Sequence, residues 1–278
     1  MVLGRYIRRA APLAVAVGLV CPGLALANMP ATCGDAQARN DQKILDSALE
    51  YKAPAALATM VPALEEVLSH APASYPQIEQ VGKVYRIRGI ADDKASSLTL
   101  MLMVTAASEH RSAQAVRCPD TYPNAALLAG VYWNEVKAPE KALAALDRGY
   151  ALRPGDSKLV TERGISLLLL KRLEEAIAMY STWLEGVSNS TNDSGLVTML
   201  SEMTDKGADR DRARVLRARA FSYVELNKLD LAEADYNASL VLEPGNGRAL
   251  GELNYIAGLR GGSAPTAVVI GTVKAPRD

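Results

Sequence analysis

The stretch that decides the fold is PNAALLAGVYWNEVKAPEKALAALDRGYALRPGD at 123–156, together with the segment 157–190 that follows it. The two segments align without a gap. The matched pairs are Gly130 and Gly164, Trp133 and Leu167, Ala142 and Ala176, Leu146 and Tyr180, and Gly149 and Trp183. The same positions return in a third copy as Ala220, Tyr223, Ala232, Tyr236 and Ser239, which follows the second copy after an insertion. A period of about 34 residues is the length of one helix-turn-helix unit.

The residue types at this period suit helices that pack closely. Gly130, Gly164 and Ala220 leave room for a neighbouring helix, and large residues elsewhere in the period fill the space between helices. A single helix pair would leave its apolar face uncovered, so the pairs are expected to stack on one another. The runs Pro154-Gly-Asp and Pro244-Gly-Asn are typical of a helix end followed by the cap of the next helix.

At these residues the chain resembles a tetratricopeptide repeat (TPR) protein. The resemblance is strongest over 123–156 and 213–246 and extends over the second helix of 157–190. It implies an all-α fold, an α-solenoid of antiparallel helix pairs. A composition rich in Ala, with only one Phe, is in keeping with a single helical solenoid.

The pattern divides the chain into six parts. These are a signal peptide at 1–27, a degenerate TPR-like helical region at 28–122, two repeats at 123–190, an insertion at 191–212, a repeat with a capping helix at 213–259, and a flexible tail at 260–278. Within the degenerate region, 41–74 fits the repeat, although Pro62 is expected to remove a backbone hydrogen bond from its second helix. Segment 75–122 is interpreted as a lengthened repeat that begins with Ile78, Gly82 and Tyr85 and includes an apolar helix at 98–108.

The N-terminus predicts export. Arg5, Arg8 and Arg9 precede an uncharged stretch at 10–27, which ends in Ala25-Leu-Ala27. This small-x-small ending is what signal peptidase accepts, so we expect a mature protein that begins at Asn28, is periplasmic or secreted, and does not span the membrane. The alternative is an uncleaved membrane anchor, which the Pro and Gly residues within the stretch disfavour.

Cleavage would leave two cysteines, Cys33 and Cys118. An even number in an oxidising compartment predicts a disulfide between them, which would stabilise the fold by about 4 kcal/mol in the chain-entropy model. The alternative is two separate free thiols.

Catalytic motifs are missing from the sequence. The two histidines, His70 and His110, are far apart in the sequence and form no helical metal pair, so we expect no metal. There is no nucleophile elbow, phosphate-binding glycine loop or nucleotide fingerprint, so we expect no cofactor. The mature chain has 31 − 3 = 28 basic and 31 acidic residues, a net charge of −3, which does not favour binding to nucleic acid.

A binding surface is the remaining candidate. In the TPR fold the first helices of successive repeats line a concave groove. Mapped onto this chain, that face comprises Lys83, Arg86, Asn124, Leu127, Val131, Asn134, Glu135, Lys158, Thr161, Ile165, Arg214, Arg217, Phe221 and Glu225. We take Lys83, Arg86, Asn124, Asn134 and Lys158 as candidate contacts to a protein or peptide. Asn124, Asn134 and Lys158 also supply residue types of the family's peptide-carboxylate clamps, without the full arrangement.

A second candidate is one helical stripe. Arg210, Arg214, Arg217 and Phe221 are spaced by four, three and four positions, which places them on one helix face. Arg and aromatic residues dominate protein interfaces. The alternative is a solvated Arg face neutralised by Asp209, Asp211 and Glu225.

The sequence therefore favours an exported scaffold or adaptor, not an enzyme, that binds a protein or peptide segment in the cell envelope. One alternative is a helical accessory subunit or enzyme with its site in 75–122, which burial of His110 beside carboxylates would favour. Another is a structural spacer in an envelope complex.

Overall fold

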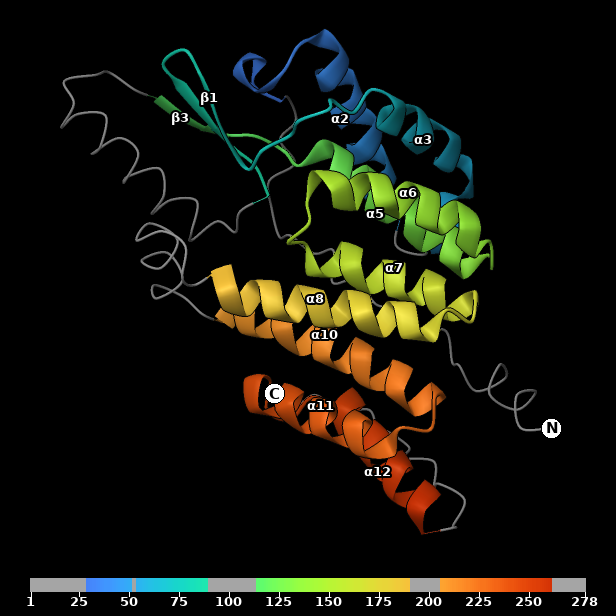
Figure 1. Cartoon of the computed structure of the whole chain (residues 1–278). Helices are drawn as coiled ribbons and strands as arrows, with labels where there is room; N and C mark the ends of the chain where they lie inside the picture. The colour runs from blue at the N-terminus through green and yellow to red at the C-terminus, as the bar shows by residue number, and fades with distance from the viewer. Residues whose placement is uncertain (1–28, 52–53, 90–113, 191–205, 262–278) are drawn as a thin grey trace, which may run out of the picture.

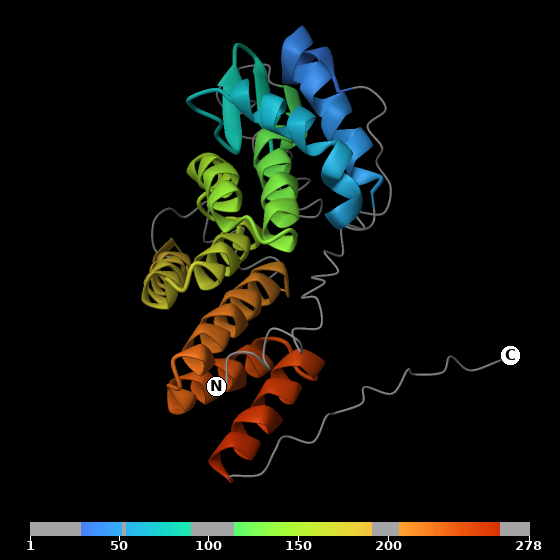
Figure 2. The ribbon, with the colours of Figure 1, turned by 90° about the vertical axis from the view of Figure 1, so that its right-hand side faces the viewer.

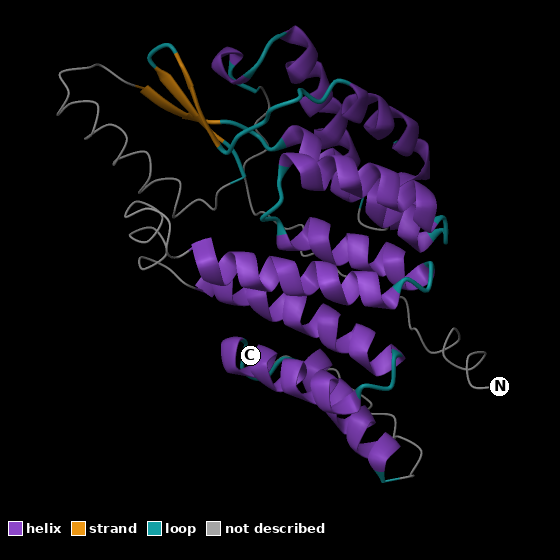
Figure 3. Cartoon of the chain, viewed as in Figure 1, coloured by secondary structure: helices purple, strands orange, loops and turns teal. Residues whose placement is uncertain are grey.

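Helices predominate in the computed structural model, which describes residues 29–51, 54–89, 114–190 and 206–261. Successive helices stack side by side from the N-terminal end to the C-terminal end, and a small sheet lies to one side of the N-terminal helices (Figure 1, Figure 3). The predicted all-α helical repeat fold is confirmed. The predicted signal peptide, most of the insertion and nearly all of the tail lie outside the described residues, as do the predicted helix at 98–108 and His110.

Antiparallel helix pairs occupy the three predicted repeats, and a last helix covers the end. The helices are α5 (Thr121–Glu135) and α6 (Pro139–Leu152), α7 (Ser157–Leu169) and α8 (Leu173–Ser190), α10 (Lys206–Glu225) and α11 (Leu229–Leu242), and finally α12 (Gly247–Arg260). The first helix of each pair packs against the second helix of the same pair. The first helices also pack against one another, α5 on α7 and α7 on α10. Since α10 begins at Lys206, the insertion predicted for 191–212 is wrong at its C-terminal end: 206–212 belongs to the third pair.

The turn inside each pair repeats with the same period. Lys137, Lys171 and Asn227 occupy the same place in the three pairs and have φ of 60°, 62° and 55°. In each turn the next residue donates its N–H to the carbonyl five positions back, at 2.8, 2.8 and 2.9 Å. This left-handed residue and 6→1 hydrogen bond are the Schellman helix ending. The repeat register therefore holds in the backbone as well as in the side chains.

Small residues allow the close helix contacts that the sequence predicts. A Cβ on Gly130 would lie 2.3 Å from Leu146, and one on Gly164 would lie 1.6 Å from the Tyr180 hydroxyl. Both glycines are thus required by packing against the second helix of their own pair. The side chains of Asp156 and Asn246 accept hydrogen bonds from the first turns of α7 and α12, which confirms the predicted caps.

The N-terminal helices extend the stack. The 3-10 turn η1 (Ala31–Cys33) leads into α2 (Ala36–Leu49), and after η2 (Pro54–Thr59) helix α3 (Val61–Ser69) packs on α5. The expectation that Pro62 removes a helical hydrogen bond is wrong, because Pro62 lies in the first turn of α3, where its N–H has no helical partner.

A three-stranded sheet replaces part of the predicted lengthened repeat at 75–122. Strands β1 (Ile78–Val81) and β2 (Val84–Ile87) form an antiparallel hairpin, and β3 (Gln114–Arg117) pairs with β2 in parallel. The helical interpretation of Ile78, Gly82 and Tyr85 is therefore wrong. Gly82 has φ of 61° in a two-residue connection, as hairpin turns that match strand twist require.

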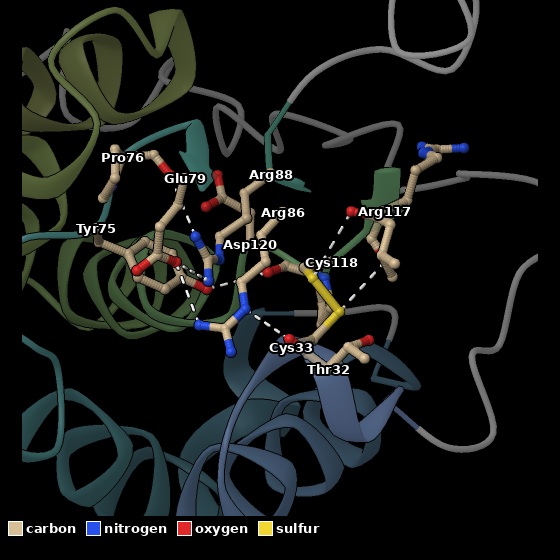
Figure 4. A network of polar contacts seen from close by, with 12 residues as sticks. Thr32, Cys33, Tyr75, Pro76, Glu79, Arg86, Arg88, Arg117, Cys118 and Asp120 are labelled. Carbon is tan, nitrogen blue, oxygen red and sulfur yellow. Dashed lines mark hydrogen bonds and ion pairs between the residues drawn. A yellow bond between two sulfur atoms is a disulfide. The ribbon is translucent and has the colours of Figure 1, made fainter. Parts of the chain in front are cut away.

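The sheet is fastened to the helices around a disulfide (Figure 4). Cys33 in η1 and Cys118 just after β3 form the predicted disulfide, with their Cα atoms 5.4 Å apart. Nearby, Arg88 donates to Glu79 at 2.8 Å and lies over the Tyr75 ring, 4.6 Å from its centroid. Two further polar contacts of this cluster are Arg86 Nε to the Thr32 carbonyl at 2.5 Å and the ion pair of Arg153 with Asp120.

Candidate partner-binding groove

The first helices of the repeats form a continuous layer. α5 packs on α7, and α7 packs on α10. The stacking of the pairs from α5 to α12 is visible in Figure 2, turned from the view of Figure 1. In such an array, residues that share a repeat position follow one another from helix to helix. Side chains at one position therefore form a row that crosses the layer.

Three of the four residues in one of these rows are basic. Asn124, Lys158, Arg214 and Arg248 share one repeat position on α5, α7, α10 and α12. Lys158 and Arg248 are exposed, and Asn124 and Arg214 are half-buried. Asn124, Lys158 and Arg214 belong to the face predicted from the sequence, whereas Arg248 was not predicted, although it lies one period after Arg214. We call these four residues the basic row.

A second row is apolar and half-exposed. Val131, Ile165, Phe221 and Tyr255 each lie seven positions after a member of the basic row, and all four are half-buried. Seven residues of helix span about 10 Å. We call this set the apolar row. Val131, Ile165 and Phe221 were predicted to face the groove, whereas Tyr255 was missed because the last helix was treated only as a cap.

The predicted arginine stripe on α10 is held by carboxylates of the chain itself. Arg217 donates to Glu243 at 2.7 Å, and Arg214 donates to Asp211 at 2.9 Å and to Ser157 Oγ at 2.6 Å. Arg210 is exposed. Glu243 was not among the predicted neutralising residues, because it comes from the end of α11. The stripe therefore joins helices as well as presenting charge.

Asn134 lies inside the helix layer and not on its surface. Its side chain is buried, donates to the Glu162 carbonyl at 3.0 Å and to the Glu162 carboxylate at 3.2 Å, and accepts from Ser166 Oγ at 2.8 Å. Asn134 therefore bridges α5 and α7. The prediction that places Lys83 and Arg86 on a first helix is also wrong, because Lys83 lies in the hairpin turn and Arg86 on β2.

Glu162 is a buried carboxylate with no cationic partner in the described structure. Burial raises its pKa to about 7, and the hydrogen bond from Asn134 only partly offsets this effect. Burial also raises the pKa of the Tyr180 hydroxyl, and the charge of Glu162 adds to that increase. The layer behind the two rows thus contains a group that titrates near neutral pH.

Neither metal nor membrane features stand out in the described part of the chain. There, no cluster of three or more His, Cys, Asp or Glu residues is arranged to hold a metal ion. His70 Nδ1 lies 3.0 Å from Asp41 Oδ1 at the N-terminal end of the stack. Among the described helices, none combines the length and the apolar character needed to cross a bilayer.

Comparison with known proteins gives little beyond this geometry. No protein-family model matches the chain, and no curated protein matches it. Among solved structures, the NMR structure of the first TPR domain of the human RPAP3 protein is similar, with a TM-score of 0.38 and 20% identity. That match covers 51% of this chain and 94% of the domain. The assignment of TPR-like helical repeats therefore rests on the register, turns and pairing described above.

Proposed function

We propose that this chain is an exported scaffold or adaptor that binds a segment of another envelope protein in its groove. The observation that carries the proposal is the pair of rows, one basic and one apolar, repeated over α5, α7, α10 and α12. The aromatic residues of the apolar row, Phe221 and Tyr255, and the Arg residues of the basic row are of the types enriched in protein interfaces.

The spacing of the rows defines the partner's chemistry. Apolar side chains of a bound segment would cover Val131, Ile165 and Phe221, and a carboxylate about 10 Å away would meet Lys158. Both an acidic side chain and a chain terminus carry such a carboxylate.

Two further observations support export. The N-terminal sequence has the order of a cleaved signal peptide. The Cys33–Cys118 disulfide suits an oxidising compartment, where such bonds persist.

Capture from an envelope extract tests the groove. The cleaved, oxidised protein is expected to retain a partner, and Phe221→Ala or Lys158→Glu is expected to reduce retention by about tenfold or more. Lys43→Glu, the same charge change on the exposed face of α2, is the matched control. Equal capture by all four proteins would refute the groove as the binding site.

Export has its own test, so the two parts can fail separately. Mass measurement of the native protein is expected to show a chain that begins at Asn28. A native protein that retains residues 1–27 would refute cleavage while leaving the groove assignment untouched.

A further inference from the structure

The outer edge of β1 presents main-chain hydrogen-bonding groups that no described residue uses. In the strand order β1-β2-β3, β1 is an edge strand. Arg88 N donates to the Gln77 carbonyl at 2.8 Å, which marks Gln77 and Arg88 as a hydrogen-bonded pair. Such pairs alternate along an antiparallel ladder, so Glu79 and Val81 bond to β2 while Ile78 and Gln80 direct their N–H and C=O groups away from it.

Three protections against pairing, namely Pro, Lys and a bulge, are missing from this edge, although the strand is only four residues long and carries the charge of Glu79. Native edge strands are commonly blunted by Pro, Lys or a bulge. β1 is Ile-Glu-Gln-Val and pairs with β2 in continuous register. Its apolar side chains Ile78 and Val81 are 38% and 43% exposed, so the edge offers apolar contacts as well as hydrogen bonds.

The edge is also held in place before any partner arrives. The disulfide follows β3 directly, and Arg86 and Arg88 tie Glu79 of β1 to neighbouring parts of the chain (Figure 4). A preformed template loses less conformational entropy on binding than a flexible strand would. Only an extended segment can satisfy the alternating groups of Ile78 and Gln80.

Charge defines which extended segment fits. The hairpin, 78–88, contains Lys83, Arg86 and Arg88 against the single acid Glu79, a net charge of 3 − 1 = +2. Glu79 already accepts from Arg88 at 2.8 Å and from Arg86 at 3.3 Å. An acidic segment is therefore attracted, whereas the β1 edge of a second copy brings the same positive charge.

We propose that the outer edge of β1 binds an acidic, extended segment of a partner protein, which adds to the sheet as a further strand. This site is separate from the groove on the first helices and does not depend on it. Main-chain bonds to Ile78 and Gln80 supply the register, and Ile78, Val81 and Lys83 supply side-chain contacts.

The test is amide hydrogen exchange of the cleaved, oxidised protein with a synthetic peptide in which Glu alternates with Val. We expect the peptide to slow exchange at Ile78 and Gln80 by about tenfold or more. Two control peptides are expected to leave exchange unchanged: one carries N-methyl groups on the backbone positions that would pair, and the other has Lys in place of Glu.

A matched pair of variants tests the same contact from the protein side. Gln80→Pro removes only an outward N–H, because Gln80 lies between the ladder bonds, and Pro is tolerated on edge strands. It is expected to abolish binding, whereas Gln80→Ala keeps it. Protection at Glu79 that is unaltered in Gln80→Pro would show that the hairpin of this variant is intact. The N-methylated peptide tests the same main-chain contact without any change to the protein.

Three outcomes would overturn the proposal. The first is peptide binding that survives backbone N-methylation. The second is slow exchange at Ile78 and Gln80 in the free, dilute protein, which means that the chain itself covers the edge. The third is protection that rises with protein concentration in the absence of peptide, which assigns the edge to a second copy of this chain.

Discussion

Replacement of Glu162 by Gln is expected to remove a large part of the pH dependence of folding stability. Burial places the pKa of Glu162 at about 7 in the folded protein, against 4.5 for an ordinary glutamate. A group whose pKa is raised by folding stabilises the fold fully below its unfolded pKa, and this contribution is lost as pH rises through the folded pKa. The free energy of unfolding should therefore fall between about pH 4.5 and pH 7 as Glu162 ionises.

The size of the effect follows from the same two values. A pKa raised from 4.5 to about 7 corresponds to about 3 kcal/mol of unfolding free energy. Gln keeps an oxygen that can accept from Asn134 Nδ2, so the bridge from α5 to α7 is retained without a charge. Glu162→Gln should therefore be more stable than the wild type at about pH 8 and nearly equal to it at about pH 5.

Denaturant unfolding of the oxidised protein across this pH range is the assay. Glu66→Gln, the same change at an exposed position of α3, is the control and should follow the wild-type profile. Equal pH profiles for the wild type and Glu162→Gln, or a loss of stability in the variant at alkaline pH, would refute the buried-carboxylate argument.

Packing and cross-linking give two further predictions. Gly164→Ala should cost about 1–3 kcal/mol in a thermal melt, because the new Cβ would lie 1.6 Å from the Tyr180 hydroxyl; Gly251→Ala, with no atom within 4 Å, should be neutral or stabilising. A Gly164→Ala protein as stable as the wild type would contradict the helix register. Reduction of the disulfide, whose cysteines have a sequence separation of 85, should lower the unfolding free energy by about 4 kcal/mol. Unchanged denaturation midpoints with and without reductant would count against that value.

The repeat region could be predicted from the sequence because each signal acts locally. Gly130 and Gly164 mark close helix contacts, and Asp156 and Asn246 cap helices within a few residues of their own positions. The period then repeats these local signals, so a position that is ambiguous in one repeat can be interpreted from the equivalent positions in the other repeats. The pairing of Cys33 with Cys118 could be proposed because the predicted cleavage leaves only these two cysteines in a chain expected to enter an oxidising compartment.

The sheet could not be predicted because one of its two pairings is not local. β2 ends at Ile87 and β3 begins only at Gln114, and their parallel register joins Val84 to Gln114 and Ile87 to Arg117. No period points to that pairing. The hairpin did carry a local signal, Gly82 between two runs with β-branched residues, but the expected helical repeat took precedence over it.

Asn134 shows why register alone does not locate a binding residue. The repeat position places a side chain on a helix face, but neighbouring helices cover part of that face. Asn134 points to α7 and is buried by Glu162 and Ser166, whereas Lys158, on the same layer of first helices, is exposed. A row of side chains is buried where it falls between two helices and exposed where it falls on the open surface of the layer. The exposed members of the basic row, Lys158 and Arg248, lie on α7 and α12, and the half-buried apolar row crosses α5, α7 and α10, so a partner that contacts both rows must run across the helices and not along one of them.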